Sequence, residues 1–378
     1  MAVFIKPLKN YTSSKINKEK TMSSIHQDAN IEFLNLKNCV IRYVSPIAAM
    51  LYPLTLMGFH ACIEAVNTAD EHSVLMIWLS WIAAGMFLLI AFAIPLLALF
   101  MTMRLSSIET PTLAETRARL AALLAVATPP IFTLIGVIFY MLGIADYDKW
   151  LVTIFWAVLV INIAYGEDRH PVNRLNLPDK TKLGTAHGVT ALGILLIFLI
   201  GHLANQFTGL FGEGTHTIVM KTLRHIYRSP LVEPILLLGF LFQIVTGFYL
   251  VRQFTNTVTD QFRTFQIASG VYLIFFLVSH INAVLILART YLNIDPGWGF
   301  ATGMPAGLIQ DAWNIRLLPL YGYALFFVLS HLASGARVVM LAHGKRQVLA
   351  DRVMIWGAVF AALFSTAVLS GMCGLRLH

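Results

Sequence analysis

The sequence is poor in charged residues. Only 12% of its 378 residues are Asp, Glu, Lys or Arg, while 57% are hydrophobic and the mean hydropathy is +0.72. Soluble domains carry roughly 25% charged residues, so this composition excludes an ordinary soluble domain and predicts a multi-pass membrane protein. The net charge of +8 therefore predicts basic loops on the cytoplasmic side of a membrane rather than a nucleic-acid partner.

Cysteine is also scarce. Cys39, Cys62 and Cys373 lie far apart and form no CxxC pair, which argues against a disulfide framework and against a thiolate metal or iron–sulfur site. Flavin and dinucleotide motifs are missing as well, so we do not expect the chain to be an enzyme on its own. Residues 1–43 form a polar, lysine-rich cytoplasmic tail without the apolar core of a secretory signal, and Met22 is an alternative start.

Long apolar runs are what the sequence does contain. They predict an all-α, polytopic membrane helix bundle of about nine transmembrane helices. Because the fourth run is short, eight crossing helices with one buried or re-entrant helix is the alternative. The runs are Val44–Val66, Val74–Met101, Leu120–Gly143, Trp150–Tyr165, His187–Phe207, Leu231–Val251, Phe265–Leu287, Leu317–Leu341 and Val353–Gly371.

The distribution of Lys and Arg predicts the orientation. With the N-terminus inside, most basic residues fall in cytoplasmic segments, as the positive-inside rule requires. The exception is the outside segment Gly212–Ser229, which carries Lys221, Arg224 and Arg228. This segment is typical of a short amphipathic helix that lies in the membrane interface.

Two histidines lie at one depth in the outer half of the membrane. With a helix rise of about 1.5 Å per residue, His202 is about 22 Å outward from His187. His280 is likewise about 25 Å outward from Arg263. The two helices run in the same direction, so their histidines are predicted to face each other across the bundle.

A second pair falls in the inner half. Gln243 is about 13 Å from Arg252, and His331 is about 9 Å from Arg337, each measured along its helix. An ionisable side chain at membrane depth is expected to pair with another residue, to bind a ligand or to carry a proton. A histidine that is hydrogen-bonded to a neighbouring helix is the plain alternative for each of these positions.

Two neutral imidazoles that face each other inside a helix bundle supply both axial ligands of a haem iron. Zinc is a poorer match, because a structural zinc site uses four ligands and often thiolates. Small residues beside the outer histidines leave room for a flat macrocycle, although ordinary close helix packing explains them equally well. They are Gly201, Ala204, Ser279 and Ala283.

These histidine-bearing stretches resemble one family, the cytochrome b membrane subunit of succinate dehydrogenases and fumarate reductases, of the five-helix, two-haem type. The resemblance covers residues from about 185 to about 375. The stretches that carry it are HGVTALGILLIFLIGHL from His187, YRSPLVEPILLLGFLFQIVTGFYL from Tyr227, FQIASGVYLIFFLVSH from Phe265 and SHLASG from Ser330.

The resemblance implies the haem ligands. It assigns His202 and His280 to an outer haem, and it assigns Gln243 and His331 to the positions of an inner haem. Glutamine is not an ordinary axial ligand of haem iron. The resemblance therefore implies one bis-histidine haem b in the outer half, with His202 and His280 as the metal ligands. His187 is then expected near a haem propionate or a quinone pocket at the inner end.

The resemblance also divides the chain. Residues 44–166 become an accessory four-helix membrane module, and residues 185–375 become the five-helix, cytochrome-b-like haem module. The implied function is electron transfer with quinone, and redox turnover would need flavoprotein and iron–sulfur partner subunits. The implied location is the bacterial cytoplasmic membrane, with a mitochondrial membrane as the alternative.

Two other functions stay open. One is a stand-alone membrane protein in lipid homeostasis or in a structural role, with membrane lipids as its partners and without redox turnover. The other is a proton or solute transporter that uses His202, His280 and His331 as a relay. The acidic and basic side chains expected along such a path are missing from the helices.

Overall fold

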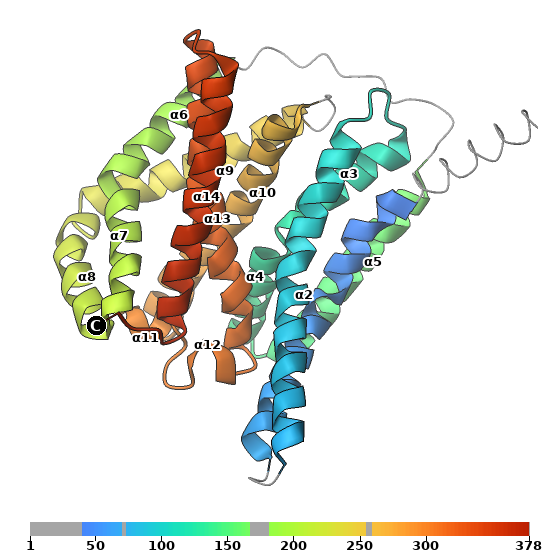
Figure 1. The fold of residues 1–378 in the computed structure, drawn as a ribbon. Coiled ribbons are helices and arrows are strands. Elements are labelled where there is room, and N and C mark those ends of the chain that lie inside the picture. Colours follow the sequence, from blue (N-terminus) through green and yellow to red (C-terminus); the bar gives the residue numbers. More distant parts are fainter. Residues whose placement is uncertain (1–39, 70–72, 167–180, 255–258, 378) are drawn as a thin grey trace, which may run out of the picture.

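The computed structural model describes residues 40–69, 73–166, 181–254 and 259–377, so most of the polar tail predicted for residues 1–43 lies outside the described residues. Every regular element in these ranges is a helix (Figure 1). The predicted all-α helix bundle is therefore confirmed for the part of the chain that the structure describes.

The N-terminal half forms one side of the bundle. Its elements are the helix Val40–Thr68, α2 (Val74–Ser106), α3 (Leu113–Val126), α4 (Thr128–Met141), η1 (Ala145–Tyr147) and α5 (Asp148–Ala164). Thr112 and Glu115 begin α3 with a capping box, in which each side chain bonds the other residue's backbone N–H. The sequence Thr-x-x-Glu thus sets where this helix starts.

The C-terminal half begins with one continuous helical span, Lys182–Phe211, in which π- and 3-10-helical segments alternate with α-helix, and two further helices follow it. The elements are α6 (Thr181–Ile194), η2 (Leu195–Leu199), α7 (Ile200–Thr208), η3 (Gly209–Phe211), α8 (Glu213–Tyr227) and α9 (Val232–Phe254). Gly212, with φ of 104°, ends η3 in a conformation that favours glycine, and the chain turns there into α8. The helix expected over residues 212–229 is therefore present as α8.

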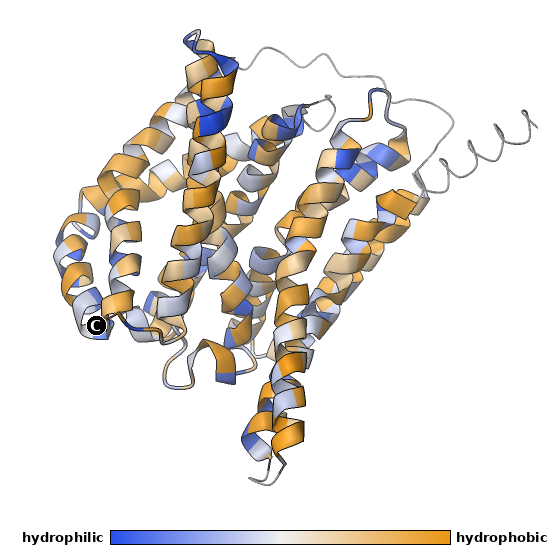
Figure 2. Ribbon diagram, in the orientation of Figure 1, coloured by the Kyte–Doolittle hydropathy of each residue, from blue (hydrophilic) through white to orange (hydrophobic). Residues whose placement is uncertain are grey.

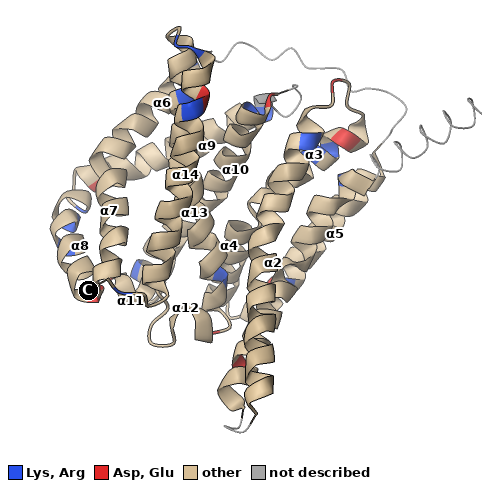
Figure 3. Cartoon of the chain, viewed as in Figure 1, with Lys and Arg blue, Asp and Glu red and all other residues tan. Residues whose placement is uncertain are grey.

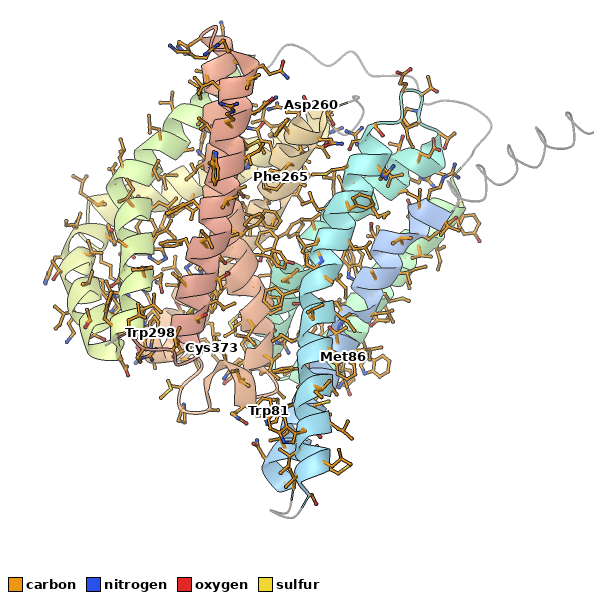
Figure 4. The ribbon with its side chains drawn as sticks, in the orientation of Figure 1. Trp81, Met86, Asp260, Phe265, Trp298 and Cys373 are labelled. Atoms are coloured by element: carbon orange, nitrogen blue, oxygen red, sulfur yellow. The ribbon has the colours of Figure 1, made fainter. Side chains whose placement is uncertain are left out.

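The remaining helices complete the bundle. They are α10 (Gln261–Ile281), η4 (Asn282–Tyr291), α11 (Trp298–Ala301), α12 (Gly307–Gln310), η5 (Asn314–Arg316), α13 (Leu317–Ala342) and α14 (Gln347–Met372). The Asp260 carboxylate caps α10 by accepting a hydrogen bond from the Arg263 N–H. In Figure 4, Asp260 and Trp298 lie at opposite ends of the bundle.

Eight helices of the described residues are long and apolar enough to cross a membrane, and a bent pair raises the number to nine if it counts as one span. The protein is a multi-pass membrane protein. The bend falls at the third predicted span and not at the short fourth one, because α3 and α4 meet at 68°. Pro129 and Pro130 stand in the first turn of α4, where proline ends the preceding helix and starts the next. By contrast, α2 runs through Pro95 without a break.

The distribution of apolar and charged residues along the helices agrees with the assignment of membrane-spanning helices. Figure 2 shows apolar residues along the long helices, and Figure 3 shows Lys, Arg, Asp and Glu mostly near the ends of the bundle. Lys182–Phe211, Gln261–Tyr291 and Asn314–Ala342, three of the eight candidate spans, carry the histidines discussed below, which are His187, His202, His280 and His331.

One hydrophobic core joins the two halves. Tyr52 and Trp156 of the N-terminal half and Tyr272 and Phe327 of the C-terminal half are all 0% exposed and belong to this core. The Asp148 carboxylate and the Arg316 guanidinium also cross the boundary and form a buried ion pair of 2.6 Å. The helices α10 and α13, which carry His280 and His331, therefore rest on the N-terminal helices as well as on one another.

Candidate functional site

The outer histidines face each other. The imidazole of His202 on α7 and that of His280 on α10 have ring centres 6.2 Å apart, with their planes inclined by 66°. Within the part of the chain that the structure describes, neither ring forms a hydrogen bond. The facing arrangement predicted from helix depth is therefore confirmed, and both rings keep their nitrogen atoms available for a ligand.

The distance between the two rings suits coordination of one metal ion from opposite sides. A nitrogen–metal bond of about 2 Å on each side, with about 1.1 Å from each nitrogen to its ring centre, gives a separation of about 6 Å. The observed distance of 6.2 Å matches this value. Two ligands leave the other coordination positions to a group that brings its own, as the four nitrogens of a haem do.

A phenylalanine one helical turn earlier stacks on each outer histidine. Phe198 lies 4.9 Å from His202 with the planes at 17°, and Phe276 lies 5.2 Å from His280 with the planes at 20°. Phe240 of α9 packs edge-on against Phe198 at 5.6 Å. The pair thus lies among aromatic rings that fix its orientation and offer an apolar contact surface.

Sequence reasoning missed these aromatic residues, although the pattern is visible. The letters FLIGH end at His202, FLVSH end at His280, and FVLSH end at His331. Residues four apart lie on one face of a helix, so each phenylalanine was placed to touch its histidine. A search for phenylalanine four positions before histidine would have found both stacks.

Both helices depart from α-helical geometry beside their histidines. The π-helical segment η2 (Leu195–Leu199) ends just before His202, and the π-helical segment η4 (Asn282–Tyr291) begins just after His280. Such segments are rare and occur often at functional sites. The Tyr227 hydroxyl of α8 donates a hydrogen bond of 3.1 Å to the Phe198 carbonyl of η2.

Tyr227 also explains one of the small residues beside His202, which is Gly201. A Cβ added at Gly201 would lie 2.1 Å from the Tyr227 hydroxyl, so the space beside Gly201 is filled by that side chain. Close helix packing, and not room for a macrocycle, explains this glycine. Near His280, the Ser279 hydroxyl and the Asn282 amide nitrogen are buried without a hydrogen-bond partner.

The inner histidines are bound differently. His331 of α13 forms a hydrogen bond of 2.9 Å between its Nδ1 and the Ser269 hydroxyl of α10. A Cβ at Gly270 would lie 3.3 Å from the His331 ring, which shows how closely α10 passes it. His331 therefore has the partner on a neighbouring helix that an ordinary core histidine has.

Gln243 and His187 belong to a separate contact between α6 and α9. The Gln243 amide donates a hydrogen bond of 2.9 Å to the His187 carbonyl, and His187 Nδ1 lies 2.7 Å from the Thr246 hydroxyl. Among the described residues, no hydrogen bond or ring contact joins Gln243 to His331. The structure thus brings together His202 with His280, and His187 with Gln243, but not the two positions of an inner haem.

A further histidine, His216 of α8, caps the outer end and was not singled out from the sequence. It is 3% exposed, shares a hydrogen bond of 3.1 Å between its Nε2 and the Asn205 amide, and packs on Trp298 at 4.6 Å. Burial and then the charge of Arg224 lower the pKa of His216 to about 4, so it is neutral at pH 7. Trp298 is itself buried, with 4% of its surface exposed.

Ion pairs hold α8 in place over this end. Arg224 and Arg228 each bind the Asp295 carboxylate at 2.5 Å, and Arg224 also donates to the Pro296 carbonyl. These arginines lower the pKa of Asp295, which keeps its carboxylate charged. The segment after η4 is thereby tied to α8.

The donor set fits a haem better than a metal bound by protein alone. The described residues contain no group of three or more His, Cys, Asp or Glu side chains that could hold a metal ion. A pair of unbonded imidazoles at a coordination distance is the chemistry that axial haem ligation uses. The residues present therefore fit a haem at His202 and His280.

Comparison with protein-family models, curated proteins and solved structures gives no match. The likeness to the cytochrome b subunits rests on the motifs quoted from the sequence.

Proposed function

We propose that this integral membrane protein binds one haem b through His202 and His280 and transfers electrons to or from quinone. The observation that carries the proposal is the pair of facing imidazoles, 6.2 Å apart and without hydrogen bonds among the described residues. The chain is not an enzyme by itself in this proposal. It resembles the cytochrome b subunit of succinate dehydrogenases and fumarate reductases.

The side chains of this site would do two things. His202 and His280 would each hold the group by one ring nitrogen. Phe198 and Phe276 would fix the rotation of the two rings by stacking on them. A haem held in this way supplies reversible one-electron transfer.

The inner positions support one haem and not two. His331 is engaged with Ser269, and Gln243 is engaged with the His187 backbone. An electron path across the whole membrane would therefore lack its inner carrier. Exchange with quinone or with flavoprotein and iron–sulfur partner subunits is accordingly assigned to the side of the membrane near His202 and His280. His187 has no part in iron binding.

The orientation belongs to the same proposal. With the N-terminus inside a bacterial cytoplasmic membrane, α7 and α10 carry His202 and His280 outward. Their haem would then lie in the outer half of the bilayer. Labelling of single cysteines introduced at Lys345 and at Lys221 from each side of the membrane would test this orientation.

A reduced-minus-oxidised difference spectrum of the purified protein tests the haem. We expect a b-type band that is lost in His202→Ala and in His280→Ala and is retained in His331→Ala, the matched control. Retained helical circular dichroism shows that the variants still fold. Absence of the band from the unaltered protein would overturn the proposal and favour a structural or lipid-related role.

A further inference from the structure

A cavity of about 430 Å³ opens between the start of α9 and η4, at the outer end of the bundle. Its walls combine apolar side chains with one ion pair. Pro230, Pro234, Leu237 and Leu285 form the apolar part, and Glu233 and Arg289 form the ion pair. The volume is in the range of sites that bind small molecules, about 300–1,000 Å³.

The ion pair does not cover the whole guanidinium. Arg289 Nη1 donates to the Glu233 carboxylate at 2.5 Å, and the Arg289 side chain, which lines the cavity, stays 30% exposed. Its exposed N–H groups can donate to an oxygen atom of a bound molecule.

The charges near the cavity favour an anion. In the wall itself, Arg289 and Glu233 balance each other. Beside the wall, Arg224 and Arg228 share the single carboxylate of Asp295, and Arg224 interacts electrostatically with Arg289, so this neighbouring group adds one positive charge. A phosphodiester carries one negative charge and binds arginine well.

We propose that this cavity binds an anionic phospholipid, with its phosphate at Arg289 and an acyl chain along Leu237 and Leu285. The place fits such a molecule. Arg289 and Thr290 lie at the outer end of the span Gln261–Tyr291, where headgroups meet the hydrocarbon core. The apolar wall and the partly exposed Arg289 guanidinium match the two parts of a lipid. This site does not depend on the proposed haem.

Titration of the full-length protein in detergent tests the site, with dioleoyl phosphatidylglycerol as the probe. Dioleoyl phosphatidylcholine has the same acyl chains without net charge, and inorganic phosphate has the charge without the chains. We expect the phosphatidylglycerol Kd to be at least tenfold lower than the phosphatidylcholine Kd, and inorganic phosphate to compete only weakly. Native mass spectrometry should show one phosphatidylglycerol retained per chain.

Three variants locate the binding. Arg289→Gln combined with Glu233→Gln removes both charges of the pair together, and Leu285→Trp fills the cavity while it keeps every charge. Both are expected to abolish the tenfold preference. Lys221→Gln is the matched control, because it removes an exposed positive charge from α8 away from the cavity walls, and it is expected to keep the preference.

Equal affinity for the two lipids would overturn the proposal, as would an unchanged preference in the double variant or in Leu285→Trp. Complete competition by inorganic phosphate would show a site for free anions and would also overturn it. Helical circular dichroism of each variant shows whether the chain has folded. If the double variant does not fold, the lipid preference of Leu285→Trp alone decides whether the proposal holds.

Discussion

At the outer end of the bundle, His202 and His280 face each other without hydrogen bonds among the described residues, whereas at the inner end His331 and His187 are bonded to hydroxyl groups of neighbouring helices. The four side chains share one chemistry and lie in similar apolar helices. They differ in what their ring nitrogens contact. Depth and motif paired His331 with Gln243 and put His187 at the inner end of its helix, but neither shows the hydroxyl partners of these two histidines.

The difference separates a role in packing from a role in binding. A buried polar group without a partner costs about 1–3 kcal/mol, so an inner histidine that has its hydroxyl partner needs nothing more. The outer pair has no such partner among the described residues, and each of its helices carries a π-helical segment beside the histidine. In the proposed function a bound group takes the place of that partner, and it would leave the inner histidines unaffected.

Exchange of an axial ligand would produce the largest effect. His202→Met is expected to replace one imidazole by a thioether and to raise the midpoint potential of the bound haem, on the order of 0.1 V within the roughly 0.8 V that axial ligands span. A redox titration followed at the b-type band measures it. His331→Met should leave the potential unchanged, and a similar shift in both variants would remove the distinction between the outer and inner pairs.

Acid should weaken the outer end through His216, the histidine that caps it. Its pKa is lowered to about 4 in the fold, while an unfolded histidine titrates near 6.5, so the unfolded chain binds the proton first as pH falls. The stability from neutral His216 is complete above about pH 6.5 and is lost progressively down to about pH 4. The difference in pKa corresponds to about 3 kcal/mol.

Thermal unfolding in detergent between pH 7.5 and pH 4 measures this loss. His216→Gln keeps a side chain that can bond Asn205 and has no titratable group, so its unfolding should lose this part of the pH dependence. If the variant has the same pH profile as the unaltered protein, the dependence comes from other groups.

Much of the fold follows from the sequence, because hydropathy identifies helices that must satisfy their own backbone in lipid. Each predicted apolar run has a helix in the structure. Hydropathy did not show that the third run consists of two helices bent by 68°, because it carries no information on the direction of the helix axis. The capping box at Thr112 and the pair Pro129 and Pro130 were the available signals.

The site was predictable in part. Helix rise placed His202 and His280 at one depth, but depth carries no information on helix rotation, which decides whether side chains face each other. The inner pair shows this limit, because Gln243 turns to the His187 backbone. The buried ion pair of Asp148 and Arg316 has no local signal, since its partners are far apart in the sequence.

Added methyl groups at two glycines test how tightly each region is packed. In Gly201→Ala the new Cβ would lie 2.1 Å from the Tyr227 hydroxyl and would disturb its bond to Phe198. Overpacking of about 3 kcal/mol, less about 1 kcal/mol of helix propensity, gives a loss of about 2 kcal/mol. In Gly270→Ala the nearest atom, on His331, is 3.3 Å away, so the two terms should nearly cancel.

Denaturant unfolding of both variants compares the two regions directly. A larger loss for Gly270→Ala than for Gly201→Ala would mean that the inner end is the more tightly packed one. It would also contradict the position of Tyr227 against η2.

Removal of the inner hydroxyl should have a small effect and is the most direct check on the inner histidine. Ser269→Ala leaves His331 Nδ1 without its partner, which is expected to cost about 1 kcal/mol of unfolding free energy. The b-type band and its potential should not change, because the outer ligands are untouched. Thr366→Ala is the matched control, since it removes an exposed hydroxyl that bonds only within its own helix. A change in the haem spectrum of Ser269→Ala, absent from the control, would instead make His331 an iron ligand and the inner end a second haem site.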